Sequence, residues 1–238
     1  MSQSRRWPLV VLFVGVALLC ARLGFWQVDR LRQREASNAA IAAARRAPPV
    51  DLTTARQVTG VTAGQAVTAR GTYDFDHEIV VMGRALGGTP GVHIITPLRL
   101  SGSERAVLVN RGFVPTPDAF TVELDSLREP GPVEVRGVAQ EFASTADRSP
   151  PSRRSGAISV SRVHFGSLRD LLPYPLLHVI VRQDTAAALP ALPYRLPPDP
   201  LDEGPHLGYA IQWFAFSAIA LVFAAIFLRR VSPPRRAP

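Results

Sequence analysis

A histidine and two aromatic residues recur at helical spacing near the C-terminal end of the chain. In the stretch "PHLGYAIQWF" they are His206, Tyr209 and Trp213, and Ala210 and Ser217 belong to the same stripe. Residues three, four and seven positions apart share one face of an α-helix, from which Gln212 points away. A neutral imidazole beside two aromatic rings is suited to be an axial ligand of haem iron, with the rings against the macrocycle.

A membrane-interface belt is an equally good explanation for Tyr209 and Trp213, because both residue types favour the headgroup level of a bilayer. The belt gives no reason for a histidine. An ionisable group at the end of a spanning helix is a candidate for function, so His206 is the main candidate.

The stretch "LGFWQVDR" contains a second group, formed by Trp26, Gln27 and Arg30. Arg30 follows Trp26 by four residues and Gln27 by three, so all three are neighbours on one helix face. Two explanations for Arg30 are equally good. Its long side chain places the charge at the membrane surface, or its guanidinium pairs with a carboxylate, such as a haem propionate at the depth of His206.

Two apolar runs carry these residues, from Leu9 to Phe25, interrupted only by Arg22, and from Leu207 to Leu228. The second run forms a helix of roughly 33 Å, which is long enough to cross a bilayer core. The first run follows Arg5 and Arg6 as in a signal peptide, but no small residues mark a cleavage site after it. We expect both runs to remain as membrane-spanning helices.

The net charge of +8 is concentrated beside these runs. Of the 27 Arg, 20 lie between Val28 and Pro205, together with all 19 acidic residues, and the chain has no Lys. The central segment is therefore nearly neutral, which argues against nucleic acid as a partner.

The second run is preceded by the acidic "DPLDEGPH" and followed by the basic "RRVSPPRR". Basic flanks stay in the cytoplasm, so both termini of a chain with two spans are predicted to be cytoplasmic and the central segment to lie on the outer face. We expect a multi-pass protein of a bacterial cell membrane, in contact with membrane lipid.

The predicted organisation has seven segments. Pro48 and Pro49 end the first helix, and prolines dominate the return to the second run. The segments are a cytoplasmic N-terminus (1–8), a first span (9–27), a helical stalk (28–47), a β-rich domain (48–189), a Pro-rich tether (190–205), a second span (206–228) and a basic cytoplasmic tail (229–238).

The central segment shows the pattern of short strands. Alternating or compact apolar runs predict strands at 67–73, 78–82, 91–100, 105–114, 133–139 and 177–182, a short helix at 165–172, and a loop without apolar periodicity at 143–156. The expected fold class is a membrane protein whose two transmembrane helices flank a β-rich (α+β) extracytoplasmic domain, an antiparallel barrel or sandwich. The single Cys excludes a disulfide framework.

Two of these strands share the pattern V-x-x-R-G, in "VTARGTY" and "VEVRGVA". Glycine inside a strand marks a bulge or a tight bend, and two such strands could close a small barrel. The apolar alternation of "VLVNRGF" reaches Arg111 and Gly112, which predicts a bulge or turn there. Arg111 then either pairs with a carboxylate of its own domain or, with Gly112, contacts a partner.

The sequence contains none of the common catalytic signatures: no G-x-S-x-G, P-loop, H-E-x-x-H or dinucleotide fingerprint. The histidines of the central part lack ligand spacing, and one Cys with two Met is a poor donor set for copper. We expect a protein that is not an enzyme.

Three motifs, in this order, resemble the Surfeit-locus, or SURF-like, family of cytochrome c oxidase assembly factors. They are "LGFWQVDRLRQR", "VLVNRGFVP" and "HLGYAIQWFAF", and the similarity covers almost the whole chain. The family pattern commonly has Trp where this chain has Phe113, and the segment 157–184 is less similar to it.

The resemblance implies a biogenesis factor that assists insertion of haem a into the catalytic subunit of cytochrome c oxidase, with haem a synthase as a further partner. His206 matches the proposed haem-ligating histidine, metal ligand to the haem iron, with Tyr209 and Trp213 around it. The alternatives are a membrane-anchored scaffold that binds oxidase subunits without haem, and an enzyme with an unfamiliar active site.

Overall fold

The computed structural model describes residues 7–55, 60–154, 156–197 and 200–231. The chain divides into two compact units, one formed by residues 1–40 and 201–238 and the other by residues 41–200. Arg5, Arg6, Arg235 and Arg236, which contribute to the predicted topology, lie outside the described residues, as do most of the predicted terminal segments.

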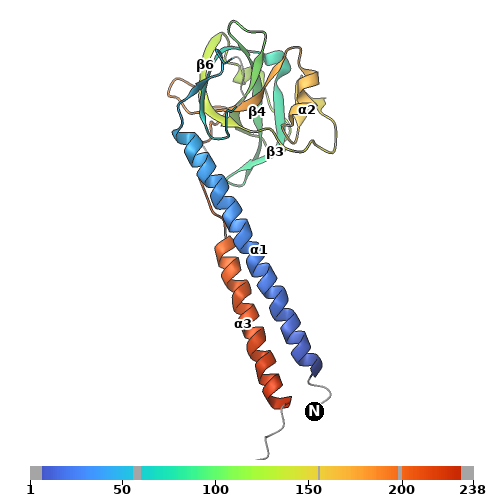
Figure 1. Ribbon diagram of the computed structural model, residues 1–238. Helices are drawn as coiled ribbons and strands as arrows, with labels where there is room; N and C mark the ends of the chain where they lie inside the picture. The colour runs from blue at the N-terminus through green and yellow to red at the C-terminus, as the bar shows by residue number, and fades with distance from the viewer. Residues whose placement is uncertain (1–6, 56–59, 155, 198–199, 232–238) are drawn as a thin grey trace, which may run out of the picture. The chain divides into compact units, whose positions relative to one another are not determined.

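Two long helices form the first unit, except that residues 41–46 of the first helix belong to the second unit. Helix α1 (Trp7–Arg46) contains both the predicted first span and the predicted stalk, and helix α3 (His206–Val231) begins at the predicted residue. The two helices lie side by side (Figure 1). Helix α1 ends before Pro48 and Pro49, because proline cannot donate the backbone hydrogen bond that continues a helix. Both helices are long and apolar enough to cross a membrane.

The two helices meet along a seam of small residues. The buried positions recur at intervals of three, four or seven, the heptad spacing of helices that pack along one stripe. They are Val10, Ala17, Cys20, Gly24 and Gln27 on α1, and Ala210, Ser217, Ala220 and Ala224 on α3. A Cβ atom on Gly24 would lie 2.7 Å from the ring of Phe214, and Ser217 Oγ donates a hydrogen bond to the Ala17 carbonyl oxygen at 2.8 Å. The small residues therefore allow close helix contact.

The second unit, residues 41–200, contains all the described strands and has wider bounds than the β-rich domain predicted at 48–189. Its strands are β1 (Val50–Asp51), β2 (Ala66–Tyr73), β3 (Ile79–Leu86), β4 (Thr89–Leu100), β5 (Ala106–Pro115), β6 (Pro132–Gln140), β7 (Ser152–Arg154), β8 (Ala157–Val160) and β9 (Leu176–Gln183). The short helices are η2 (Phe75–His77), η3 (Asp125–Leu127), α2 (Phe165–Leu168) and η4 (Arg169–Leu171). Each predicted strand is present, and α2 with η4 occupies most of the predicted helix.

The described strands form one sheet in the order β1-β2-β6-β9-β5-β4-β3-β8-β7, and β2 also pairs with β4. The strands β2, β6, β9, β5 and β4 are thus paired in a closed circuit. The prediction of purely antiparallel pairing was wrong, because β1–β2, β3–β8 and β5–β9 are parallel. The long connections between these pairs leave their relative direction open in the sequence. The predicted loop at 143–156 contains strand β7 at its end.

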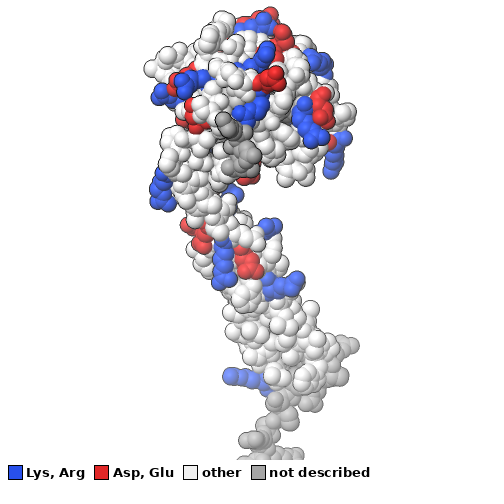
Figure 2. Space-filling model, turned by 45° about the horizontal axis from the view of Figure 1, so that its top comes forward, with Lys and Arg blue, Asp and Glu red and all other residues white. Residues whose placement is uncertain are grey.

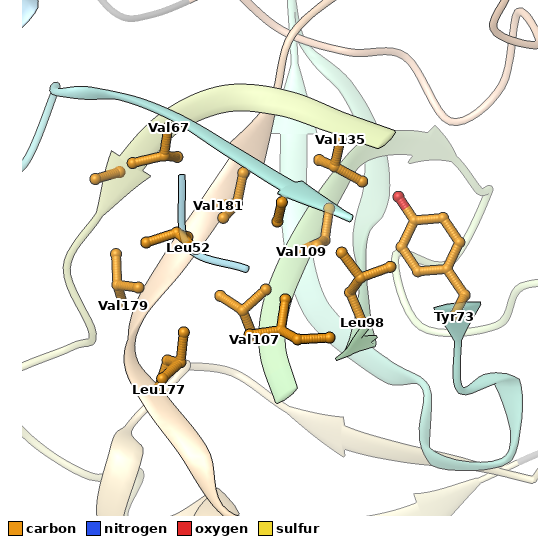
Figure 3. Packing of buried hydrophobic residues seen from close by; sticks show 13 residues of the cluster. Leu52, Val67, Tyr73, Leu98, Val107, Val109, Val135, Leu177, Val179 and Val181 are labelled. Carbon is orange, nitrogen blue, oxygen red and sulfur yellow. The ribbon is translucent and has the colours of Figure 1, made fainter. Parts of the chain in front are cut away.

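The core is divided between the two faces of the central strand β5. Val107 and Val109 belong to the cluster shown in Figure 3, together with Leu52 and Val181. Leu108, which points to the other face, packs in a second cluster with residues of β3, β8 and α2. Burial on both faces explains why this strand reads as a continuous apolar run.

Gly71 and Gly137, the glycines of the repeated V-x-x-R-G pattern, allow close contact between strands. A Cβ atom on Gly71 would lie 2.0 Å from the carbonyl oxygen of Arg99, and one on Gly137 would lie 2.0 Å from that of Arg182. Gly71 pairs with both Leu100 of β4 and Val133 of β6. Gly71 therefore lies at the point of the closed circuit where β2 has β4 on one side and β6 on the other.

We expect Gly71→Ala to lower the free energy of unfolding of the full chain by about 2–3 kcal/mol or more, because backbone atoms must move apart to admit the methyl group. Urea unfolding in detergent, followed by far-UV circular dichroism, measures the change. Thr72→Ala, at the next and exposed position of β2, is the control and should cost far less. Equal stability of the two variants would contradict the close contact.

Candidate functional site

His206 and Gln27 form a hydrogen bond between the two long helices. The imidazole Nδ1 of His206 lies 2.9 Å from Oε1 of Gln27, and Gln27 is buried. An amide oxygen only accepts hydrogen bonds, so Nδ1 is the donor, and in the neutral ring Nε2 then holds the lone pair. This is the tautomer in which a histidine binds a metal through Nε2 while a carbonyl oxygen fixes the orientation of its ring.

The heptad seam brings these two residues together. Gln27 follows Gly24 by three residues and His206 precedes Ala210 by four, and both intervals occur along the seam. Because the helices run in opposite directions, His206, the first residue of α3, meets the last buried seam position of α1. The hydrogen bond between His206 and Gln27 is therefore the last contact of the seam, at the end where α3 begins.

The segment before α3 is fastened to α1. The backbone carbonyl oxygen of Asp202 accepts hydrogen bonds from Arg34 Nε at 3.2 Å and from Asn38 Nδ2 at 3.1 Å. Its carboxylate accepts a bond from the backbone N–H of Gly204 at 2.9 Å. Thus the end of the predicted Pro-rich tether is hydrogen-bonded to α1, which fixes the start of α3 beside Gln27.

Gly204 leaves the Nε2 edge of His206 without a covering side chain. Its φ of +71° is one that glycine adopts readily, and a Cβ atom there would lie 3.6 Å from Nε2. Glycine at this position keeps a methyl-sized space free next to the lone pair.

The aromatic residues predicted around His206 differ in their surroundings. Trp213 is partly buried and lies edge-on to Phe216 at 6.0 Å between ring centroids, whereas Tyr209 is 49% exposed. Ala210 and Ser217 of the predicted stripe form part of the seam. Tyr209 is therefore a flanking residue, with a ring open to solvent or lipid.

Trp26 and Arg30 form the predicted pair on α1. The guanidinium carbon of Arg30 lies 5.7 Å from the centre of the Trp26 ring, and its Nη1 donates to Gln33 Oε1 at 3.2 Å. Gln27, which is a neighbour of Arg30 on α1 as the spacing predicts, also contacts His206 of the facing helix. The seam spacing of Cys20, Gly24 and Gln27 was the signal that could have predicted this contact.

Arg111 occupies a bulge in β5. The register pairs Ile94 with Gly112 and Ile95 with Asn110, so Arg111 is the extra residue, as the sequence predicted. Gly112 has a φ of +128°, and a Cβ atom on it would lie 2.2 Å from the carbonyl oxygen of Tyr194. Only glycine fits this position.

The Arg111 side chain is 0% exposed and is paired within its own domain. It contacts Glu78 Oε1 at 3.4 Å and Glu129 Oε1 at 2.7 Å, and it donates to the carbonyl oxygen of Leu127. Of the two alternatives for Arg111, the structure has the pairing with domain carboxylates. Neither Arg111 nor Gly112 offers exposed surface, which argues against the direct partner contact predicted for them.

Glu129 joins Arg111 to the segment that leaves the domain. It also accepts a hydrogen bond from Arg195, whose Nη1 donates to the carbonyl oxygens of Pro190 and Pro193, each at 3.0 Å. The first part of the predicted tether is therefore attached to the β-rich domain through a buried ion network.

A second polar cluster lines a hollow of about 1220 Å³ in the β-rich domain. The Asp74 carboxylate lies 2.9 Å from Nδ1 of His77 and accepts a hydrogen bond from the Tyr174 hydroxyl at 2.9 Å. It also accepts from the backbone N–H of Asp76, and so caps the short helix η2. Helix capping accounts for Asp74, while the convergent His–Asp pair is the arrangement that an unfamiliar active site would use.

Residues 14–218 match the model of the SURF1 family. The chain is 28% identical over 260 residues to a SURF1-like protein of Monosiga brevicollis, a match that covers 99% of this chain and 96% of that protein. Uncharacterized SURF1-like proteins of Mycobacterium bovis and Mycobacterium tuberculosis are 26% identical over 229 residues, covering 92% of this chain and 82% of theirs. The matched region includes Gln27 and His206.

We expect Glu129→Ala to lower the free energy of unfolding by about 3–5 kcal/mol, because it leaves Arg111 and Arg195 buried without this shared carboxylate. Urea unfolding of the full chain in detergent measures the loss. The control is Glu134→Ala, which removes an exposed carboxylate paired with Arg136 and should cost less than about 1 kcal/mol. A loss as small as that of the control would contradict the network.

Burial raises the pKa of Glu78 above its ordinary value of 4.5, against the opposing effects of the Thr96 hydrogen bond and the Arg111 charge. The native carboxyl therefore binds its proton more tightly than the unfolded chain does. Its contribution to stability is complete below pH 4.5 and is lost as the pH rises through the raised native pKa.

The free energy of unfolding of the wild type, relative to that of Glu78→Gln, should accordingly fall as the pH rises from about 4 towards neutrality. Denaturant unfolding at a series of pH values measures the difference. Glu141→Gln, at an exposed position, is the control. A relative stability of the wild type that increases with pH would contradict the raised pKa.

Proposed function

The chain belongs to the SURF1 family, and from this we propose that it is an assembly factor for a haem-copper terminal oxidase. The proposed task is to assist the insertion of haem a into the catalytic subunit of cytochrome c oxidase. The observation that carries the proposal is the hydrogen bond of His206 Nδ1 to Gln27, which leaves Nε2 free as a metal ligand.

The proposed location is a bacterial cell membrane. Two helices long and apolar enough to span it are compatible with anchoring at both ends of the chain. Cytoplasmic termini and a β-rich domain on the outer face follow from the basic and acidic flanks of the second helix. In this topology His206 lies at the outer boundary of the membrane.

The residues around His206 fit a transient haem site. Haem a, if bound, would supply an iron that takes a nitrogen ligand, which His206 would provide. Gln27 holds the imidazole in the tautomer that offers Nε2, and Gly204 leaves that edge uncovered. Because His206 begins its helix beside a fixed segment, its ring needs little reorganisation to bind a metal.

The neighbouring side chains have supporting roles in the proposal. Tyr209 and Trp213 provide aromatic surface on the turns after His206, and Trp26 does so on α1. Arg30, stacked on Trp26, carries an exposed cation that is suited to a haem propionate. The site thus combines one nitrogen donor, apolar surface and a cation.

The β-rich domain is proposed to dock the oxidase without catalysing a reaction. The circuit of paired strands supports a small barrel with mixed pairing as the domain's form. The partners proposed are the catalytic subunit, haem a synthase as the source of haem, and membrane lipid.

A scaffold that binds oxidase subunits without haem is the second candidate. The hollow lined by Asp74, His77 and Tyr174 favours it, because it offers a large polar recess in the domain. The scaffold is the better account if the purified chain recovers oxidase subunits and never takes up haem a.

We expect the full chain, co-expressed with a haem a synthase and purified, to carry haem a with the absorption spectrum of histidine ligation. His206→Ala should remove most of this haem, and Gln27→Leu should weaken its binding about 10- to 100-fold, because the ring loses its orienting partner. Gln212→Ala, exposed on the same helix, is the matched control. Equal haem content and spectra in His206→Ala and wild type would exclude His206 as the ligand.

A further inference from the structure

Arg22 is a charge placed within an apolar helix. It is the only charged residue between Trp7 and Val28, and the stretch from His206 to Leu228 contains no Asp, Glu, Lys or Arg. Arg22 is exposed and makes no hydrogen bond or ion pair with any residue that the structure describes. It lies five residues before Gln27, about 7.5 Å along the helix axis towards the centre of the proposed span.

Arg22 belongs to a second heptad stripe on α1. Its members alternate at intervals of four and three residues, as the seam residues do, and all are exposed; we name them the Arg22 face: Val11, Gly15, Leu18, Arg22, Phe25 and Asp29. Arg22 lies two residues from both Cys20 and Gly24, about 200° around the helix, so it points away from the seam occupied by α3. Phe25 borders α3, because its ring lies edge-on to that of Phe214 at 5.2 Å between centroids.

The Arg22 face is hollowed and has room for a close neighbour. A hollow of about 770 Å³ is lined by residues of α1 that include Leu18, Arg22 and Phe25, and also Trp26 of the proposed haem surroundings. A Cβ atom on Gly15 would have no atom within 4 Å, so the backbone is open to approach there. In membranes, small residues at a heptad position mark the surface on which another helix packs.

The positive charge of Arg22 indicates that a helix packed against this face carries an anionic side chain. An unpaired cation within the hydrocarbon region is costly, and such residues usually pair with an anion or face the interior of a helix bundle. Asp29 is not that anion, since its carboxylate lies 3.8 Å from Arg32. Figure 2 shows one face of the helix pair, largely uncharged beyond the stalk. Exposed residues of α3 such as Ile211 and Ile219 are apolar, as expected for contact with lipid alone.

We propose that the Arg22 face docks a transmembrane helix of a partner protein that presents an Asp or Glu side chain to Arg22. The inference rests on the membrane anchoring proposed above, and it adds a binding surface that is centred on Arg22, contains neither the seam residues nor His206, and borders the proposed haem site at Trp26. A helix is favoured over a lipid phosphate because the face combines heptad spacing, an open glycine and a hollow around the charge.

Photo-crosslinking in intact cells tests the docking. The full chain carries the photoreactive residue p-benzoylphenylalanine in place of Leu18, one turn from Arg22, and crosslinked peptides are identified by mass spectrometry. We expect adducts to an apolar helical segment that contains Asp or Glu. Arg22→Leu should lower the adduct yield about tenfold or more, while Arg22→Lys should retain most of it. The same probe at the exposed Ile219 of α3 is the control and should not label that segment.

A charge exchange sharpens the test. Arg22→Asp should abolish the adduct, and replacing the mapped acidic residue of the partner by Arg in the same cells should restore it. Adducts to lipid alone, a mapped segment without an acidic residue, or a yield unchanged by Arg22→Leu would each overturn the proposal.

Alkaline carbonate extraction of the same membranes separates this inference from the proposed function. Release of the chain by carbonate would refute both the anchoring and the docking. A retained chain that binds haem a through His206 but gives no Arg22-dependent adduct would refute the docking alone. Because Arg22 lies off the seam, Arg22→Leu should leave the haem spectrum unchanged.

Discussion

The packing of small residues between the two long helices is the constraint on which the candidate site depends. Ala17, Gly24 and Ala210 let the helices approach closely enough for His206 to reach Gln27 at the end of the seam. Larger residues in the seam would separate the helices and break that hydrogen bond. The tautomer of a single histidine is therefore set by packing along the length of both helices.

The β-rich domain uses a different device, a buried ion network in place of disulfides. Arg111, forced inward by a bulge, shares Glu129 with Arg195 and so links strand β5 to the segment that leads out of the domain. Such a network is not an efficient source of stability, because every charge in it has lost its hydration. What it provides is a fixed position for that segment.

The parts of the structure with strong periodicity were predictable, and those that depend on long-range contacts were not. The two long helices, the strands β2 to β6 and β9, and the bulge at Arg111 followed from apolar spacing and from proline and glycine, whereas the short strands β1, β7 and β8 had no such pattern. The parallel pairing of β5 with β9 did not, because direction is set by a connection without regular pattern. The spacing within one helix predicts that Gln27 and Arg30 are neighbours. It contains no information about contacts with a second helix, so it did not predict the hydrogen bond between Gln27 and His206. The role of Glu129 had no local signal in the sequence.

The most direct test of the central claim is the protonation state of the His206 ring in the haem-free protein. Nitrogen-15 NMR of the full chain, labelled at histidine and assigned by comparison with His206→Asn, distinguishes the two neutral tautomers. The hydrogen bond to Gln27 predicts a protonated Nδ1 and an unprotonated Nε2 for His206, and a change of this signal in Gln27→Leu. A proton on Nε2, or a signal that Gln27→Leu leaves unchanged, would contradict the account.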